Sequence, residues 1–543
     1  MNEETKTDRL DPFLQRAIEY WLDAVNELGY TPLFCAWLSN TGYIVKHFSK
    51  SGPFEQGKDV IAVDATGIAH AYQLKGGDIN LNRWRTEVRP EIEVLIDIPI
   101  KHPDIDKNKQ HVSYLVTNGE LEDAVRVEID DLNEHKWKTT PLHVIRRGDL
   151  LHHFQEMASG ILPKDAETYK QLMDLMFANS SALPDFDQAN SFLAKIFRIE
   201  ESVSKEQRKR DVAAAVLYTN LIVGPYRRRE NHVSVVRVLV LLMSHILLSA
   251  ERHDLQDKYW IEAYHAVWAD LLATTRLLEA EINDDGFAKA FDSPMDRDLM
   301  PLRKHIATLF VLALKVSELV AEDGAWKNIV PDFQEKYKEV VALWGEASLI
   351  PFIFLTLIFR NVEGGEPSAY QFAQHAIDQI IALNGRKAKE RPGLLPPYYD
   401  VDFAVKRAFK LIEEDFEEDY RHASYYLKPL IELLARAGQR SILSARWQDI
   451  SFIRFEQYMP DADWHYYLWR SPGGENATFE VEKVQSWAKL VEAAGQMNGG
   501  KLPRLLKRFP EFIPFFLATF PQRLDVETLG YLDMMSIKPD SSE

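Results

Sequence analysis

The chain has 543 residues, of which 46% are apolar and 27% charged, so it has the composition of a globular protein but is too long for a single core. The net charge of −18 excludes tight nonspecific binding of free nucleic acid unless a basic strip, a metal ion or a partner intervenes. The single cysteine, Cys35, excludes an intramolecular disulfide and a cysteine-ligated zinc site, and we expect a reducing, cytoplasmic location.

The first predicted element is an amphipathic helix over residues 10–28. Its apolar residues recur with helical spacing, and we expect the helix to end at Gly29. Glu19 lies beside the apolar stripe, so its carboxylate can face neighbouring structure. A second acid that could serve the same purpose, Glu55, lies in a loop rich in glycine and proline.

A β-hairpin follows, with polar residues at its open end. Asp59 precedes a β-rich run, and a second β-rich run leads into Gln73-Leu74-Lys75. Two residues apart on a strand, Gln73 and Lys75 project from one face and Leu74 from the other. We therefore expect Asp59, Gln73 and Lys75 to lie close together. The strands are predicted at 60–63 and 68–74, with the turn at 64–67.

These residue types suit metal-dependent hydrolysis of a phosphodiester. Mg²⁺ is held by few protein oxygens and several waters, and it polarises the phosphate and acidifies the attacking water. Asp59 is the natural first ligand, and the carbonyl oxygens of Gln73 and Leu74 are further candidates. Lys75 can orient the nucleophile and offset the charge that develops. Mg²⁺, or Mn²⁺ in its place, is the predicted cofactor, and because Gln73 is neutral the ion needs a further acid.

A possible nucleic-acid contact follows the hairpin. We predict a helix over residues 81–98, and Arg83, Arg85 and Arg89 could form a basic strip with Lys75; a solvated helix face is the alternative. Such a strip matters because residues 1–160 contain 18 Lys and Arg against 26 Asp and Glu. Further strands are predicted at 111–117 and 142–145, the latter leading into a helix.

The order of these elements resembles the Mrr-like branch of the PD-(D/E)xK nuclease superfamily, in its Gln-x-Lys variant. The matching features are a helix with an inner acid, Gly57-Lys58-Asp59, the hairpin, Gln-x-Lys, a long helix and the strand Ser-Tyr-Leu-Val-Thr-Asn-Gly. The resemblance covers about the first 155 residues and implies a restriction-endonuclease-like α/β domain that cleaves DNA. It also implies an active site of Asp59, Gln73 and Lys75, assisted by Glu19 as a further metal-binding acid.

Beyond residue 160 the pattern becomes helical. The apolar run 233–248 is interrupted by Arg237 and is shorter than the ~20 residues that a bilayer needs, so we predict a buried helix and no membrane association. A basic, Pro- and Gly-rich segment from Gly385 predicts a linker. Domains are therefore expected at 1–158 (nuclease-like), 159–384 (helical) and 385–543 (helical and aromatic-rich). Helices are predicted at 166–176, 189–197, 205–222, 232–249, 258–281, 296–322, 333–343, 349–359, 369–383, 401–414 and 423–437.

The function that these patterns favour is that of a Mg²⁺-dependent DNA endonuclease. The resemblance implies the effector of a prokaryotic antiviral defence or restriction system, regulated by an ATPase, by an Argonaute-like partner or by self-assembly into a homo-oligomer. Two alternatives stay open. One is a noncatalytic interaction subunit with a degenerate nuclease fold, and the other is a ligand-gated nuclease whose helical region is the sensor.

Overall fold

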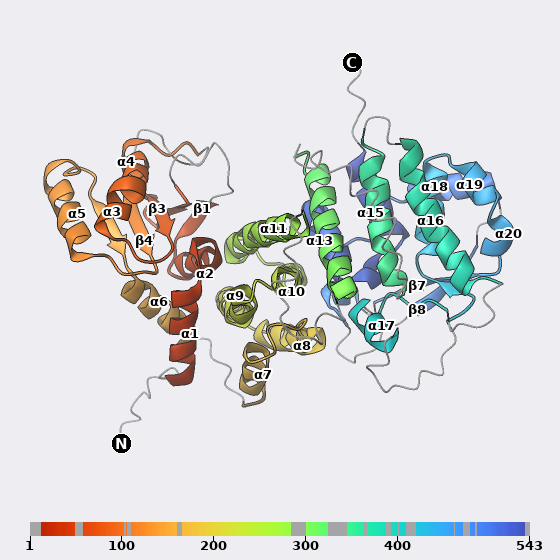
Figure 1. Ribbon diagram of the computed structural model, residues 1–543, viewed down its shortest axis with the longest axis horizontal. Helices are drawn as coiled ribbons and strands as arrows, with labels where there is room; N and C mark the ends of the chain where they lie inside the picture. The colour runs from red at the N-terminus through yellow and green to blue at the C-terminus, as the bar shows by residue number, and fades with distance from the viewer. Residues whose placement is uncertain are drawn as a thin grey trace, which may run out of the picture. The chain divides into compact units, whose positions relative to one another are not determined.

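The protein is a mixed α/β and mostly helical chain (Figure 1). It divides into two compact units, residues 1–273 and 274–543, with the division inside α11 (Ile261–Asn283). The predicted domain boundaries at 158 and 384 both fall inside these units. The predicted combination of an α/β part with a large helical part is confirmed at this level. The computed structural model describes residues 12–48, 58–102, 105, 110–159, 166–283, 300–323, 345–362, 366–386, 393–399, 401–408, 420–460, 462–470, 478–483 and 486–537.

A five-stranded mixed sheet organises the N-terminal part of the first unit. The first three strands are antiparallel, and the third, fourth and fifth are parallel, so β3 is the central strand. Four of the five strands were predicted, and the edge strand β1 was not. In spatial order the strands are β1 (Ile44–Phe48), β2 (Val60–Val63), β3 (Ala69–Lys75), β4 (Val112–Thr117) and β5 (Leu142–Ile145).

The predicted first helix is wrong at its C-terminal end. It is divided into α1 (Pro12–Ala24) and α2 (Glu27–Asn40), and Gly29 lies inside α2. The side chain of Asn26 accepts a hydrogen bond from the Gly29 N–H at 2.9 Å, which caps a new helix and turns the chain. Apolar spacing continues across this cap, and this continuity hid the break in the sequence.

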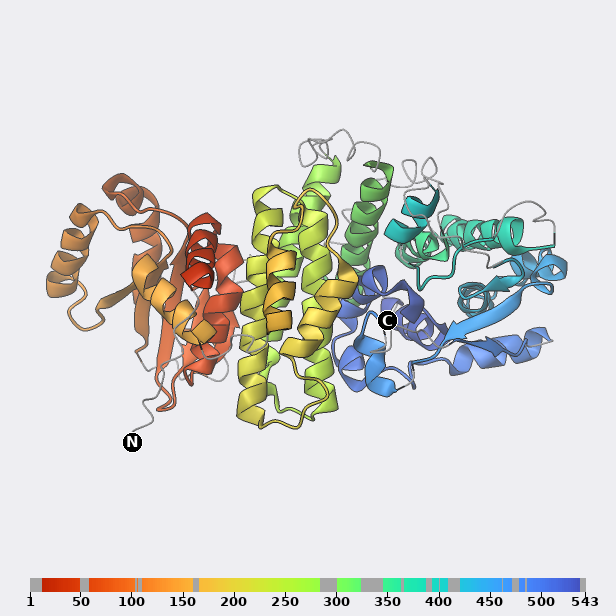
Figure 2. The ribbon, with the colours of Figure 1, turned by 90° about the horizontal axis from the view of Figure 1, so that it is seen from below.

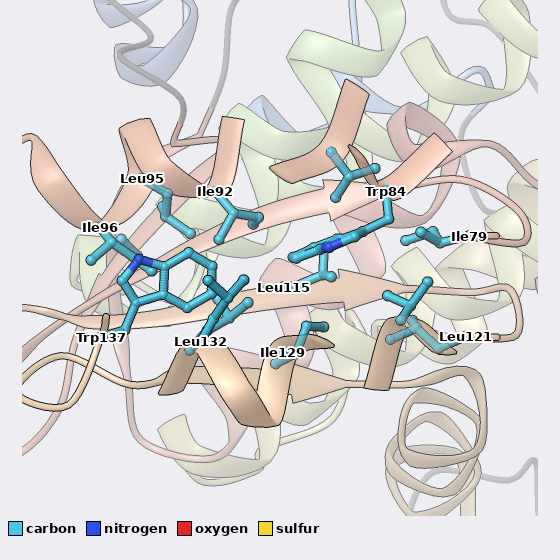
Figure 3. Packing of buried hydrophobic residues seen from close by; sticks show 14 of the residues in the cluster. Ile79, Trp84, Ile92, Leu95, Ile96, Leu115, Leu121, Ile129, Leu132 and Trp137 are labelled. Carbon is cyan, nitrogen blue, oxygen red and sulfur yellow. The ribbon is translucent and has the colours of Figure 1, made fainter. Parts of the chain in front are cut away.

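Helices on both sides of the sheet complete the α/β layer. On one face lie α3 (Leu81–Arg83), a π-helical turn (Trp84–Val88), α4 (Arg89–Asp97) and α5 (Asp123–His135). Figure 3 shows Trp84 and Ile92 facing Leu115 of β4, with Ile129 of α5 closing the other side of this core. On the opposite face Phe34 of α2 packs edge-on against Tyr72 of β3 at 5.3 Å between ring centroids. The chain continues into α6 (Arg147–Ser159).

The helical part of the first unit surrounds a strongly apolar helix. Figure 2 shows these helices beside the sheet domain, and α9 packs against α2, α8 and α10. Of the described helices, α10 is the one long and apolar enough to cross a bilayer, and its most apolar window is entirely buried. The predicted buried helix is confirmed. The helices are α7 (Ala166–Met176), α8 (Phe186–Ile196), α9 (Lys205–Arg228), α10 (His232–Arg252), a 3₁₀ turn (Asp257–Tyr259) and α11.

The second unit adds a small sheet to its helices, which was not predicted. Strand β6 (Ala423–Ser424) pairs in parallel with β7 (Arg454–Tyr458), which pairs antiparallel with β8 (Thr478–Val481). The helix predicted at 423–437 therefore begins only at Leu427. The helix predicted at 333–343 and the linker residues 387–392 lie outside the described residues. The helices are α13 (Met300–Val320), α15 (Ile350–Phe359), α16 (Glu366–Asn384), α17 (Val401–Ala408), α18 (Leu427–Arg436), α19 (Arg440–Ser444), α20 (Trp447–Ile450), α21 (Trp487–Gln496), α22 (Arg504–Arg508), α23 (Ile513–Thr519) and α24 (Val526–Ser536).

Candidate active site

The C-terminal end of β3 presents Gln73 and Lys75 to α4. Both residues are buried, at 5% and 7% exposure, on the strand face that the core residues Ala69 and Ala71 also occupy. The Gln73 Nε2 donates to Glu91 Oε2 at 3.1 Å, and the Lys75 Nζ lies 2.6 Å from the same oxygen. The shared face expected from strand alternation is therefore observed.

Asp59 directly precedes β2 and contacts the C-terminal end of β3. Its N–H donates to the Tyr72 carbonyl at 2.9 Å, and its carboxylate Oδ2 accepts from the Leu74 N–H at 2.7 Å. A residue's N–H and C=O point to the same edge of its strand, so the Leu74 carbonyl also points past the end of β2. The β2–β3 pairing ends at Val60 opposite Tyr72, and Asp59 lies one residue beyond it, bonded to Tyr72 and Leu74. Asp59 therefore contacts the strand segment that carries Gln73 and Leu74.

The side-chain oxygen of Gln73, Oε1, is one of several buried polar atoms that have no hydrogen-bond partner among the described residues. Leaving such an acceptor unsatisfied costs about 1–3 kcal/mol, so a buried carbonyl of this kind normally meets a donor, a water or a cation. Gln73 precedes Leu74, whose N–H binds the Asp59 carboxylate, so this oxygen belongs to the same strand end as Asp59.

The carboxyl group of Asp59 resists ionisation. Its pKa is raised to about 7, mainly by burial and also by the charges of Glu27 and Glu91, although the Leu74 N–H and the Lys75 ammonium act in the opposite direction. A bound cation would reverse this balance by stabilising the carboxylate. The site is therefore short of positive charge in the absence of an ion.

Lys75 remains an ammonium despite its burial. Burial lowers its pKa, but the hydrogen bond and charge of Glu91 and the charges of Glu27 and Glu87 more than offset this effect, so the pKa is raised. Glu87 Oε1 lies 3.7 Å from Lys75 Nζ, and Glu27 reaches the same strand end by accepting from the Gly76 N–H at 3.0 Å. Three acids therefore surround the lysine.

These donors fit a hydrated Mg²⁺ better than a metal held by protein ligands alone. No group of three or more His, Cys, Asp or Glu side chains in the described part of the chain is arranged to hold a metal ion. A site of one carboxylate and two neutral carbonyls would not form such a group, and Mg²⁺ characteristically keeps several waters. Asp59, Gln73 Oε1 and the Leu74 carbonyl would be the protein ligands.

The structure gives Glu19 a different neighbour. Glu19 Oε1 accepts from Arg147 of α6 at 3.1 Å, and the same guanidinium pairs with Asp23 at 2.5 Å. Glu19 therefore ties α1 to α6, whereas the acids that act on Asp59 are Glu27 and Glu91 from α2 and α4. The other candidate acid, Glu55, lies outside the described residues.

The three arginines proposed to contact nucleic acid all have intramolecular partners. Arg83 donates to two backbone carbonyls in the loop after β3, both at 2.9 Å. Arg85 and Arg89 pair with the same acid of α5, Glu128, at 2.8 and 2.9 Å. Arg85 is the most exposed of the three, with 59% of its side chain accessible. Arg83 thus holds the loop after β3, and Arg85 and Arg89 join the π-helical turn and α4 to α5.

Sequence reasoning missed Glu91 and Glu27. Glu91 is adjacent in sequence to the buried Ile92, as Glu19 is to the buried Ile18, so the same neighbour relation would have selected it. The π-helical turn that precedes α4 is a further signal, since such turns are frequent at functional sites, but it is visible only in the structure. Glu27 was hidden because the α1–α2 break was not predicted.

Helix α2 supports the strand end from behind. Near its N-terminus the buried Tyr30 hydroxyl donates to the carbonyls of Lys75 at 3.0 Å and Val116 at 3.3 Å. At its other end the Ser39 hydroxyl donates to Glu262 of α11, and Lys209 of α9 donates to the Ser39 carbonyl. One helix thus contacts both the candidate site and the helical part of its unit.

The arrangement combines a carboxylate, two neutral oxygens and a buried ammonium, which together can bind a divalent cation and an adjacent phosphate. Comparison of the chain with models of protein families, with curated proteins and with solved structures found no match. The chemistry of the site therefore follows from its own geometry.

Proposed function

We propose that the chain is a metal-dependent DNA endonuclease with its active site at the C-terminal end of β3, in a restriction-endonuclease-like domain. The observation that carries this proposal is that Gln73 and Lys75 are buried on one face of β3 at the point where Asp59 binds the Leu74 N–H, and that Gln73 Oε1 has no partner among the described residues. A structural ion-pair network alone would not require an unsatisfied oxygen at this point. A hard cation would satisfy it.

Each residue has a distinct role in this proposal. Asp59, Gln73 and the Leu74 carbonyl would hold Mg²⁺ or Mn²⁺, which supplies Lewis-acid activation of the phosphodiester and of water. The Lys75 ammonium donates hydrogen bonds to the scissile phosphate or to the attacking water and offsets negative charge in the transition state. The nearby carboxylates of Glu91, Glu27 and Glu87 raise its pKa in spite of its burial, so it stays protonated at neutral pH.

The charge around the site favours controlled access of DNA. Acids outnumber bases at the strand end, so a phosphate backbone is repelled until a cation is bound. Arg85 has the most accessible guanidinium of the proposed strip, and contact between it and DNA remains part of the proposal. A protein partner that delivers DNA would also overcome the repulsion.

We place this nuclease in prokaryotic antiviral defence or restriction, as a cytoplasmic effector regulated by an ATPase, an Argonaute-like protein or further copies of itself. The support is the sequence resemblance together with the large helical part, which offers surface for a partner. A noncatalytic interaction subunit is the second candidate. The observation in its favour is that β3 carries a neutral glutamine where a second carboxylate would strengthen metal binding.

Plasmid cleavage separates the two candidates. The purified chain is expected to nick supercoiled plasmid with Mg²⁺ or Mn²⁺ and not with a chelator, and Lys75→Ala should reduce the rate by about 100-fold or more because it removes a transition-state donor. Lys136→Ala is the matched control, since Lys136 pairs with Glu93 on the surface. Cleavage undiminished in Lys75→Ala refutes the assignment, and an intact plasmid under all these conditions favours the noncatalytic subunit.

A further inference from the structure

Glu91 accepts hydrogen bonds from both polar side chains of the Gln-x-Lys segment. One oxygen, Oε2, receives the Gln73 amide at 3.1 Å and lies 2.6 Å from the Lys75 ammonium. The two donors are almost fully buried, whereas Glu91 retains 39% exposure of its side chain. The carboxylate thus reaches in from α4 to a fixed pair of donors on β3.

This contact determines which way the Gln73 amide points. An amide has two chemically different ends, an NH₂ group that donates and an oxygen that accepts, whereas an ionised carboxylate only accepts. Glu91 can therefore bind only the Nε2 end. The Oε1 end must turn away from Glu91, and it is this oxygen that lies buried without a partner in the described structure.

A cation at this position needs the amide oxygen, whereas Glu91 needs the amide NH₂ group. Mg²⁺ and Mn²⁺ bind oxygen, and an amide turned by half a rotation would present N–H groups to the ion. A glutamate would offer an oxygen in either orientation, so only the glutamine needs a residue that fixes its rotation.

We infer that Glu91 is a positioning residue that orients the Gln73 amide, so that its oxygen faces the divalent cation held by Asp59. This inference rests on the metal-dependent activity proposed above. Glu91 would then belong to the metal site without coordinating the ion. Residues that orient the metal ligands in this way, from outside the coordination shell, are common in metal sites.

Exchanging the two side chains tests the inference. Glu91→Gln should weaken Mn²⁺ binding by about 10- to 100-fold, because a glutamine there can pair with either end of the Gln73 amide. Gln73→Glu alone places two carboxylates 3.1 Å apart with no proton between them. The double variant restores one donor and one acceptor with their roles exchanged, and it should bind Mn²⁺ more tightly than either single variant.

The measurement is calorimetric titration of each full-length variant with MnCl₂, with thermal unfolding of the metal-free proteins as a check of folding. Glu93→Gln is the matched control. Glu93 lies two residues after Glu91 in α4, and it pairs with Arg89 and Lys136 instead of with Gln73 and Lys75. Its Mn²⁺ affinity should equal that of the wild type.

Two results overturn the inference alone while wild-type Mn²⁺ binding still depends on Asp59. One is unchanged affinity in Glu91→Gln. The other is a Gln73→Glu variant that binds more tightly than the double variant, which would make Glu91 a direct ligand. Wild-type protein whose Mn²⁺ binding is absent, or is unaffected by Asp59→Asn, overturns the proposed metal-dependent function as well.

Discussion

Replacing Asp59 by asparagine should stabilise the metal-free protein, and increasingly so as the pH rises. The asparagine side chain keeps the size of the aspartate and an oxygen for the Leu74 N–H, but it carries no charge. In the wild type the folded-state pKa of Asp59 is raised from 3.8 to about 7, mainly by burial. The stability that this group contributes is therefore complete below its unfolded pKa and is lost as the pH rises through the folded value.

The size of this effect follows from the two pKa values. At about 1.4 kcal/mol per pKa unit, the full cost of ionising Asp59 in the folded state is at most about 4 kcal/mol. Proton linkage places about 3 kcal/mol of this change between about pH 5 and about pH 8. The difference in unfolding free energy between Asp59→Asn and the wild type should grow by this amount across that range, because the other titrating groups are common to both proteins.

This difference is measured by chemical denaturation of the full-length wild type and of Asp59→Asn in the presence of a chelator. The unfolding of the first unit is followed at several pH values. Saturating Mg²⁺ should then stabilise the wild type and leave Asp59→Asn unchanged, because the ion binds the ionised carboxylate. If the difference in unfolding free energy between wild type and Asp59→Asn stays constant between about pH 5 and about pH 8, burial does not disfavour ionisation of Asp59, and the raised pKa is refuted.

Two further predictions concern the structure that supports the site. Tyr30→Phe removes the donor to the buried carbonyls of Lys75 and Val116 and should lower the unfolding free energy by about 1–3 kcal/mol, measured by urea denaturation. An unchanged urea midpoint would contradict this. Trp84→Ala leaves a cavity in the core of Figure 3 and should cost about 3–5 kcal/mol, whereas Tyr20→Ala, at an exposed position, should cost little.

The hairpin and its polar end could be predicted because local rules determine them. Asp64 accepts hydrogen bonds from the backbone N–H groups of Thr66 and Ile68, and this is the turn chemistry that its sequence indicated. Alternation along β3 then places Gln73 and Lys75 on one face. No distant residue is needed for either conclusion.

The parts that were missed depend on contacts between distant segments. Glu91 joins the site only because α4 packs across β3, which no local pattern specifies. Strand β6 has two residues and exists through pairing of Ala423 with Arg454. The end of α1 was missed for another reason, since the Asn26 cap interrupts an apolar period that continues on both sides.

The position of α2 has a mechanical consequence. Its 14 residues form a rod about 20 Å long, with Tyr30 fastened to the strand that carries the lysine and Ser39 fastened to α9 and α11. A shift of those two helices would be transmitted along α2 to the Lys75 backbone, whose carbonyl accepts the Tyr30 hydrogen bond. Binding of a partner to the helical part would thereby change the position of a lysine that the partner does not touch.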